Sequence, residues 1–291
     1  SGTDTLASTS VSNLKVLKGQ TKVLIVKANL TAIGSESNAN QGALITTNMT
    51  TVKATGADSG NTLYSTGSAA FSGVRMFKAV PTFAKIELTP SEQALDSGTL
   101  RTLYKFSVSA PAGTNGISLK QFTINIATST YSATEGGATT TVLGIYGYSD
   151  ASCNTPLNVN SNTTGLLNSP ATGLVTGDNV VSLTTIVPIG QGLTNCFRVK
   201  GTIASAGGSV SHKTSITTYL VGDSAYPAYT WKSGLTGLMA TSTEETLLLS
   251  KLIWSPNATT SEVLTTHVDW TNGYLIPGLP SDSSMSSRVS R

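Results

Sequence analysis

Charged side chains are scarce in this sequence. Of 291 residues, 18 are Lys or Arg and 15 are Asp or Glu, which is 11% in all, against roughly 25% in ordinary soluble domains. The net charge of +3 is too small to favour a nucleic-acid partner, and the basic cluster at Lys15, Lys18, Lys22 and Lys27 is not interleaved with aromatic residues. Residues 121–197 contain no Lys or Arg.

Long apolar runs are missing as well. The longest candidates, residues 23–26 and 247–249, are strand-sized, whereas a membrane-spanning helix needs roughly 18 apolar residues. The sequence therefore predicts no membrane span.

Cysteine is limited to Cys153 and Cys196, which are 43 positions apart. An even cysteine count in an exported chain favours a disulfide, and the alternative is a pair of buried free thiols. Neither cysteine has another Cys or a His within ligand spacing, so we expect no metal site there.

Hydroxyl side chains take the place of charge, with 38 Ser and 46 Thr. Because Thr is β-branched and favoured in strands, the residues that solvate the chain also bias it towards sheet. This composition is typical of an extracellular β-protein, and we expect it at the cell surface.

Period-2 alternation recurs along the chain. Residues 104–109 alternate between apolar and polar side chains, and Asn115-Gly116 is a dipeptide typical of hairpin turns. In the returning strand, Ile117 and Leu119 share one parity and residues 122–126 follow the other, which predicts a β-bulge at Lys120-Gln121. Further strands are predicted at residues 21–31, 74–80, 85–89, 142–148, 180–187, 197–203, 216–221 and 263–270.

Many short strands with Gly-rich turns predict an all-β fold of two immunoglobulin-like β-sandwich domains. Pro81 suits a short stiff connection between them. We therefore predict an N-terminal β domain at 1–80, including an extended N-terminal segment, and a larger β-sandwich domain at 81–291 with an extended C-terminal tail.

Catalytic motifs are not evident. His267 lies two residues from Asp269, but no Gly-x-Ser-x-Gly elbow occurs, and a local polar pair is the simpler interpretation. The acidic residues are too scattered to predict a glycosidase pair. We expect no enzyme and no cofactor.

A calcium site near Asp150 competes with an Asn-rich turn, since one carboxylate among amides is a weak cation cage. Its amides are Asn154, Asn158, Asn160 and Asn162.

Glycosylation sequons begin at Asn29, Asn48, Asn162 and Asn257, which is no more than chance in so Ser/Thr-rich a chain.

Three stretches of the chain carry a resemblance: Val-Arg-Met-Phe-Lys-Ala-Val-Pro-Thr (74–82), Leu-Tyr-Lys-Phe-Ser-Val-Ser-Ala (103–110) and Asp-Trp-Thr-Asn-Gly-Tyr-Leu-Ile-Pro-Gly-Leu-Pro (269–280). They are similar to large, Thr-rich, repetitive surface proteins of the uncultivated candidate-phyla-radiation bacteria. The resemblance implies a secreted, β-sandwich, cell-surface protein and no catalytic or binding residues.

Two function classes follow. The first is a structural subunit of a pilus-like filament or surface layer, a homopolymer whose copies are joined by β-strand addition. Its assembly segment would be residues 1–16, whose only larger apolar side chains are Leu6, Val11, Leu14 and Val16.

The alternative is a carbohydrate-binding adhesin, or a binding module of an exported enzyme, with cell-surface glycans as partners. Aromatic platforms for a sugar would lie at Trp231, near Tyr226 and Tyr229, or at Trp270 with Tyr274, although core anchoring is the commoner role of Trp in a sandwich.

Overall fold

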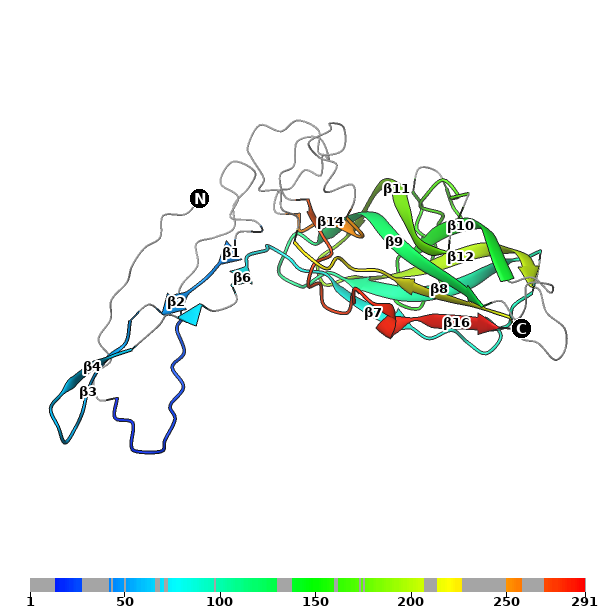
Figure 1. Cartoon of the computed structure of the whole chain (residues 1–291). Coiled ribbons are helices and arrows are strands. Elements are labelled where there is room, and N and C mark those ends of the chain that lie inside the picture. The colour runs from blue at the N-terminus through cyan, green and yellow to red at the C-terminus, as the bar shows by residue number, and fades with distance from the viewer. Residues whose placement is uncertain are drawn as a thin grey trace, which may run out of the picture. The chain divides into compact units, whose positions relative to one another are not determined.

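The computed structural model describes residues 14–27, 42, 44–49, 51–65, 69–70, 73–96, 98–129, 138–159, 162–172, 174, 176–206, 214–226, 250–257 and 270–290. Within them every regular element is a β-strand apart from one 3-10 turn, η2 (Ser283–Met285), so the all-β prediction is confirmed (Figure 1). The chain divides into two compact units, Ser1–Ala32 and Ile33–Arg291. The domain boundary near Pro81 stays a prediction.

Two antiparallel sheets form a β-sandwich. The four-stranded sheet has the order β10 (Ala138–Tyr148), β12 (Thr194–Ala206), β8 (Leu100–Ser109) and β7 (Thr82–Ile86). The six-stranded sheet is built around β9 (Ile117–Ser129), which pairs with β11 (Gly177–Ile189) along one edge. The other edge of β9 is shared by β13 (Ser215–Leu220) and β14 (Ile253–Ser255), and β16 (Ser287–Ser290) and β15 (Thr271–Asn272) lie outside them.

The core lies between the two sheets. Phe106 of the four-stranded sheet has its ring 5.1 Å from that of Phe197 on the neighbouring strand and 5.4 Å from that of Phe122 in the facing sheet. All three side chains are buried. Alternation in β8, β9 and β12 places such residues on one face of each strand, and this shared apolar layer holds the sheets together.

The predicted bulge in β9 is confirmed. Ile253 lies opposite Gln121 and Trp254 lies opposite Leu119, so Lys120 is the extra residue. The register with β11 is also shifted at this point. The bulge moves the apolar side chains of the second half of β9 back to the core face.

The predicted hairpin at Asn115-Gly116 is wrong. β8 pairs with β7 and β12, whereas β9 belongs to the other sheet, so the connection crosses from one sheet to the other. Gly116 has the positive φ of 80° that such a dipeptide favours. That conformation serves a crossing as well as a hairpin. Glycine is also required here for a second reason, because a side chain at position 116 would collide with the carbonyl oxygen of Ile189 on β11.

Most other predicted strands are present with shifted bounds. Residues 142–148, 180–187, 197–203 and 216–220 lie within β10 to β13. The predicted strand 85–89 is displaced to β7, because Thr82 pairs with Ser109 and the chain turns at Thr89, whose N–H donates to Glu92.

Two predicted strands are not confirmed. Residues 74–80 contain only β6 (Val74–Arg75), whose partner is two residues long. Of the predicted strand 21–31, residues 21–27 form no strand, and residues 28–31 lie outside the described residues. Of the predicted strand 263–270, residues 263–269 lie outside the described residues.

A long β-hairpin precedes the sandwich in sequence. Its three ladders are β1 (Leu44–Ile45) with β6, β2 (Asn48–Met49) with β5 (Ala69–Ala70), and β3 (Lys53–Thr55) with β4 (Thr62–Tyr64). The tip lies at residues 56–61, where the N–H of Gly56 donates to Asn61 and that of Gly60 donates to Gly56. We call this element the N-terminal ribbon.

Candidate assembly surfaces

Residues 14–27 are exposed throughout. Residues 23–26 (Val-Leu-Ile-Val) carry four consecutive apolar side chains with exposed fractions of 84%, 58%, 76% and 77%. Lys22 and Lys27 flank them. Apolar surface is normally withdrawn from water, so an exposed apolar run between two lysines is unusual.

The N-terminal ribbon also lacks a core among its described residues. Within 44–49 and 51–65, all residues except Ile45 and Gly56 are exposed. Ala54 pairs with Leu63, and because side chains alternate along a strand, Val52 lies on the same face. Leu63 is 66% exposed. A two-stranded hairpin is marginal by itself in water, and the described part of this face buries little apolar surface.

The base of the ribbon is held by Arg75. Its guanidinium lies 3.5 Å from the centroid of the Tyr226 ring and donates to the carbonyl oxygen of Gly42 at 2.8 Å. The N–H of Gly42 in turn donates to Met76 at 2.6 Å. Stacking and hydrogen bonding of this kind give the two ends of the ribbon a defined anchor.

The sheet edges of the sandwich are mostly covered by its own chain. The outer edge of β10 forms bridges with residues 156, 166 and 171. In β16, Ser290 exchanges hydrogen bonds with Gln93 and Leu95. On β7, the N–H of Phe83 donates to Pro277 at 2.8 Å. Covering loops of this kind protect a sheet from unwanted pairing.

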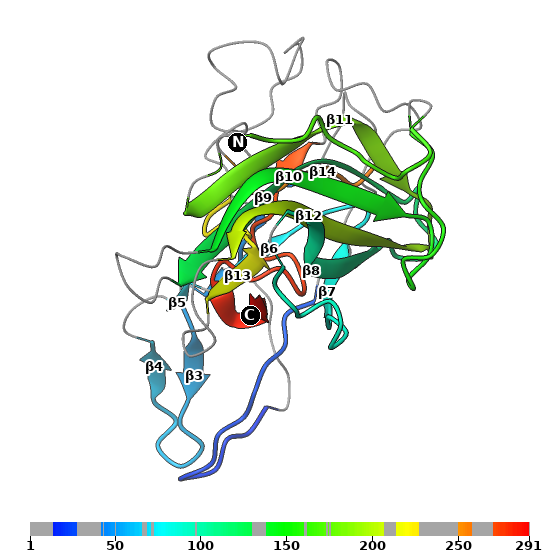
Figure 2. The ribbon, with the colours of Figure 1, turned by 90° about the vertical axis from the view of Figure 1, so that its right-hand side faces the viewer.

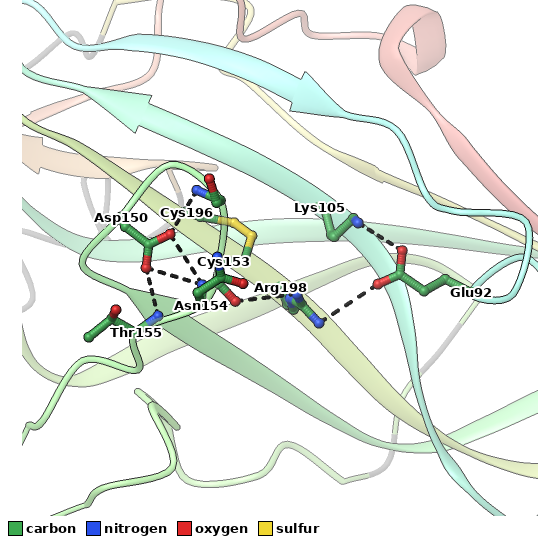
Figure 3. The surroundings of a disulfide bond; sticks show 9 residues. Glu92, Lys105, Asp150, Cys153, Asn154, Thr155, Cys196 and Arg198 are labelled. Carbon is green, nitrogen blue, oxygen red and sulfur yellow. Dashed lines mark hydrogen bonds and ion pairs between the residues drawn. A yellow bond between two sulfur atoms is a disulfide. The ribbon is translucent and has the colours of Figure 1, made fainter.

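The disulfide between Cys153 and Cys196 is formed, with 5.2 Å between the Cα atoms, and the prediction is confirmed (Figure 3). It joins the turn after β10 to β12. Asp150 shapes this turn, because its carboxylate accepts backbone N–H groups of Ser152, Asn154 and Thr155. The bond from Thr155 contributes most to lowering the pKa of Asp150. A carboxylate used in this way caps a turn, which is the alternative to a calcium site.

A charged network lies beside the disulfide (Figure 3). Glu92 accepts from Lys105 at 2.7 Å and forms an ion pair with Arg198 at 3.7 Å. Arg198 also donates to the carbonyl oxygen of Cys153. Burial raises the pKa of Glu92, but hydrogen bonds from Lys105 and Thr89 outweigh it and hold the pKa below the usual value. The network ties the loop before β8 to β12 and the disulfide turn.

Asp223 is a half-buried carboxylate that sequence reasoning did not single out. It accepts backbone N–H groups from Lys251, Leu252 and Gly273 at 2.8, 3.2 and 2.8 Å. Burial raises its pKa despite these three bonds. A buried acid with a raised pKa is a general signal of a functional site. Here its oxygens are occupied by the backbone that leads into β14 and out of β15, which is a structural role.

The predicted assembly residues are only partly described. Leu6 and Val11 lie outside the described residues, while Leu14 and Val16 are exposed. Their role stays a prediction. In the sequence, the signal for this exposed segment is a run of four apolar residues that is bounded by lysines and shows no polar alternation.

The sequons differ in accessibility. Asn48 is exposed in β2, and Asn162 is half-buried with its side-chain oxygen bonded to Thr164. Asn257 is only 4% exposed, so a glycan there is incompatible with the folded sandwich. Asn29 lies outside the described residues.

Three other residues considered for catalysis or sugar binding lie outside the described residues: His267, Asp269 and Trp231. Trp270 is fully buried, so it is a core anchor and no sugar platform. Within the described part of the chain, no three His, Cys, Asp or Glu side chains lie close enough to hold a metal ion together. Of the described segments, none is a helix long and apolar enough to cross a bilayer.

No protein-family model and no curated protein sequence matches this chain.

Proposed function

We propose that this protein is a structural subunit of an extracellular filament or surface layer, in which β-strand addition joins neighbouring copies. The observation that carries the proposal is the contrast between two regions. The sandwich buries its own core, whereas residues 23–26 and the N-terminal ribbon leave their apolar side chains in water.

The exposed segment gives association a driving force. Full burial of a fully exposed Val, Leu or Ile side chain is worth roughly 1.5–3 kcal/mol, so burial of the four at residues 23–26, which are 58–84% exposed, is worth at most roughly 6–12 kcal/mol. An ordered docked segment must also satisfy its backbone N–H and C=O groups, and a sheet edge does so. Strand addition therefore fits this segment better than a flat hydrophobic contact.

The expected location and geometry agree with this role. Formation of the Cys153–Cys196 disulfide fits an oxidising compartment, and the low charge fits a secreted surface protein. A segment that docks on a different surface of the next copy makes a head-to-tail contact, which propagates into a filament when the rotation between copies does not close a ring. Such a contact builds a homopolymer.

The glycan-binding alternative has less support among the described residues. One of its two aromatic platforms centres on Trp270, which is fully buried. In the described part of the sandwich, every pair of aromatic rings in contact includes a buried ring, so none forms an exposed platform for a sugar.

The test replaces residues 23–26 together by Thr in the full-length chain. Thr keeps the β-branched shape and removes most of the apolar surface. We expect the parent protein to sediment as large assemblies and the variant as the 29.9-kDa monomer. The matched control is Leu193→Thr, which removes an apolar side chain that is 57% exposed on the sandwich, and it should assemble normally.

Two results would count against the proposal. A parent protein that stays monomeric at millimolar concentration would overturn the structural role. A four-Thr variant that assembles like the parent would remove residues 23–26 as the connector. Deletion of residues 1–16 then tests the predicted segment that contains Leu6 and Leu14.

A further inference from the structure

One long edge of the six-stranded sheet has no partner strand among the described residues. The first half of β11, residues 177–182, pairs with β9 on one side only. On its other side the first hydrogen bond runs from the N–H of Thr184 to Leu167, at 2.8 Å. β11 lies at the margin of the sandwich in both views (Figures 1 and 2).

The backbone N–H and C=O groups of Val180 point away from β9, towards the outer edge of the sheet. Val180 lies opposite Thr123 of β9, and the carbonyl oxygen of Thr123 accepts from Val221 on the far side of β9. The pair is therefore of the type that exchanges no hydrogen bonds, and the N–H and C=O of Val180 face outwards. Thr184 lies four residues further along β11, on the same parity as Val180, and its N–H also points outwards, to the carbonyl oxygen of Leu167. The Val180 side chain is 50% exposed.

Length distinguishes this edge from the other open edge of the sandwich. β7 is open only beyond Phe83, which is bonded to Pro277, so residues 84–86 are what this strand leaves for an added strand. β11 offers residues 177–182, and its one acid, Asp178, forms an ion pair with Lys251 at 2.7 Å. An added strand of six residues therefore makes more main-chain hydrogen bonds on β11 than on β7.

We propose that residues 22–27 of one copy add as an edge strand to residues 177–182 of β11 in the next copy. The inference rests on the proposed function and names its acceptor. Both stretches are six residues long. In the added strand Val23 and Ile25 face one side and Leu24 and Val26 face the other. One of these pairs packs against the exposed Val180, and backbone bonds satisfy the outward groups of β11.

The test uses Val180→Pro in the full-length protein. Proline removes the outward N–H, which is not used by the sheet itself, so the fold tolerates it better than at a central strand. Val180→Thr is the matched control, because it keeps both the N–H and the β-branched shape. We expect Val180→Pro to raise the critical concentration for assembly about tenfold or more, and Val180→Thr to leave it within about twofold.

Cross-linking gives a measurement that does not depend on the proline variant. Val180→Cys protein is mixed with Leu24→Cys protein and, separately, with Ile25→Cys protein, and we expect a disulfide in one of the two mixtures under mild oxidation. If Val180→Pro misfolds by circular dichroism, the presence or absence of this cross-link decides the proposal.

The edge assignment is overturned if folded Val180→Pro assembles at the parent's concentration. If the four-Thr variant at residues 23–26 loses assembly while Val180→Pro keeps it, strand addition stands and the acceptor lies elsewhere. If neither change affects assembly, residues 23–26 and β11 are both excluded as the connection, whereas the proposed function itself falls only if the parent protein stays monomeric.

Discussion

Removing the disulfide should destabilise the sandwich by about 4 kcal/mol. The change is Cys153→Ala with Cys196→Ala, and the two residues are 43 positions apart. By chain-entropy reasoning, a cross-link that closes a loop of this length restricts the unfolded chain by about 4 kcal/mol. The folded state should change little, because Asp150 still accepts three backbone N–H groups in the turn and Arg198 still donates to the residue 153 carbonyl.

Guanidinium unfolding measures this loss. Trp254 is a suitable probe, since it is fully buried and its indole N–H donates to Asn272 at 2.7 Å. The control is the parent protein with its disulfide reduced. Reduction removes the cross-link but keeps the buried sulfur of Cys196, so it separates chain entropy from side-chain packing.

The result that would refute the reasoning is a loss below about 1 kcal/mol with an unchanged denaturant slope. The slope reports the surface exposed on unfolding, so an unchanged slope means that the same transition is compared. Such a small loss would show that the unfolded chain is already restricted without the cross-link.

Two further predictions concern the network beside the disulfide and the cover of β7. Glu92→Gln should cost about 1–3 kcal/mol at pH 7, because it leaves the buried Lys105 without its charged partner. Since the folded-state pKa of Glu92 lies below its ordinary value of 4.5, its contribution is complete above that pH and is lost as pH falls through the lowered pKa. The gap between variant and parent in urea unfolding should therefore close as the pH falls below 4.5 and through the lowered pKa, and a gap independent of pH would contradict this account. Gly278→Ala should cost about 2 kcal/mol more than Gly113→Ala. Both glycines have φ near +74°, but a Cβ on Gly278 collides with the carbonyl oxygen of Phe83, whereas one on Gly113 meets nothing within 4 Å; equal melting temperatures for the two variants would refute it.

Local features of the sandwich were predictable from the sequence because they depend on neighbours in the chain. The bulge at Lys120 could be predicted from the sequence, because one extra residue shifts the parity of every apolar side chain after it. The disulfide followed from cysteine parity and composition, since only one intrachain pairing of Cys153 and Cys196 exists. The all-β class followed from alternation and the abundance of Thr.

Which strands pair with one another in the sandwich could not be predicted from the sequence. Asn115-Gly116 reports a backbone with positive φ at Gly116, and the same conformation serves a hairpin or a crossing between sheets. Which of the two occurs is decided when β8 pairs with β12 rather than with β9. Such pairing joins residues about 90 positions apart and depends on the packing of the whole core.

The candidate assembly surfaces show the same division. The sequence determined that residues 23–26 are apolar and bounded by lysines, and that residues 121–197 carry no basic side chain. It could not show that the apolar run remains exposed, because an apolar run is normally buried and its burial depends on distant elements. Only the tertiary structure decided that the sandwich fills its own core without this run and leaves the backbone of Val180 facing outwards. The physical reason is that hydrophobicity and charge belong to single residues, whereas exposure and an unpaired sheet edge belong to the packed whole.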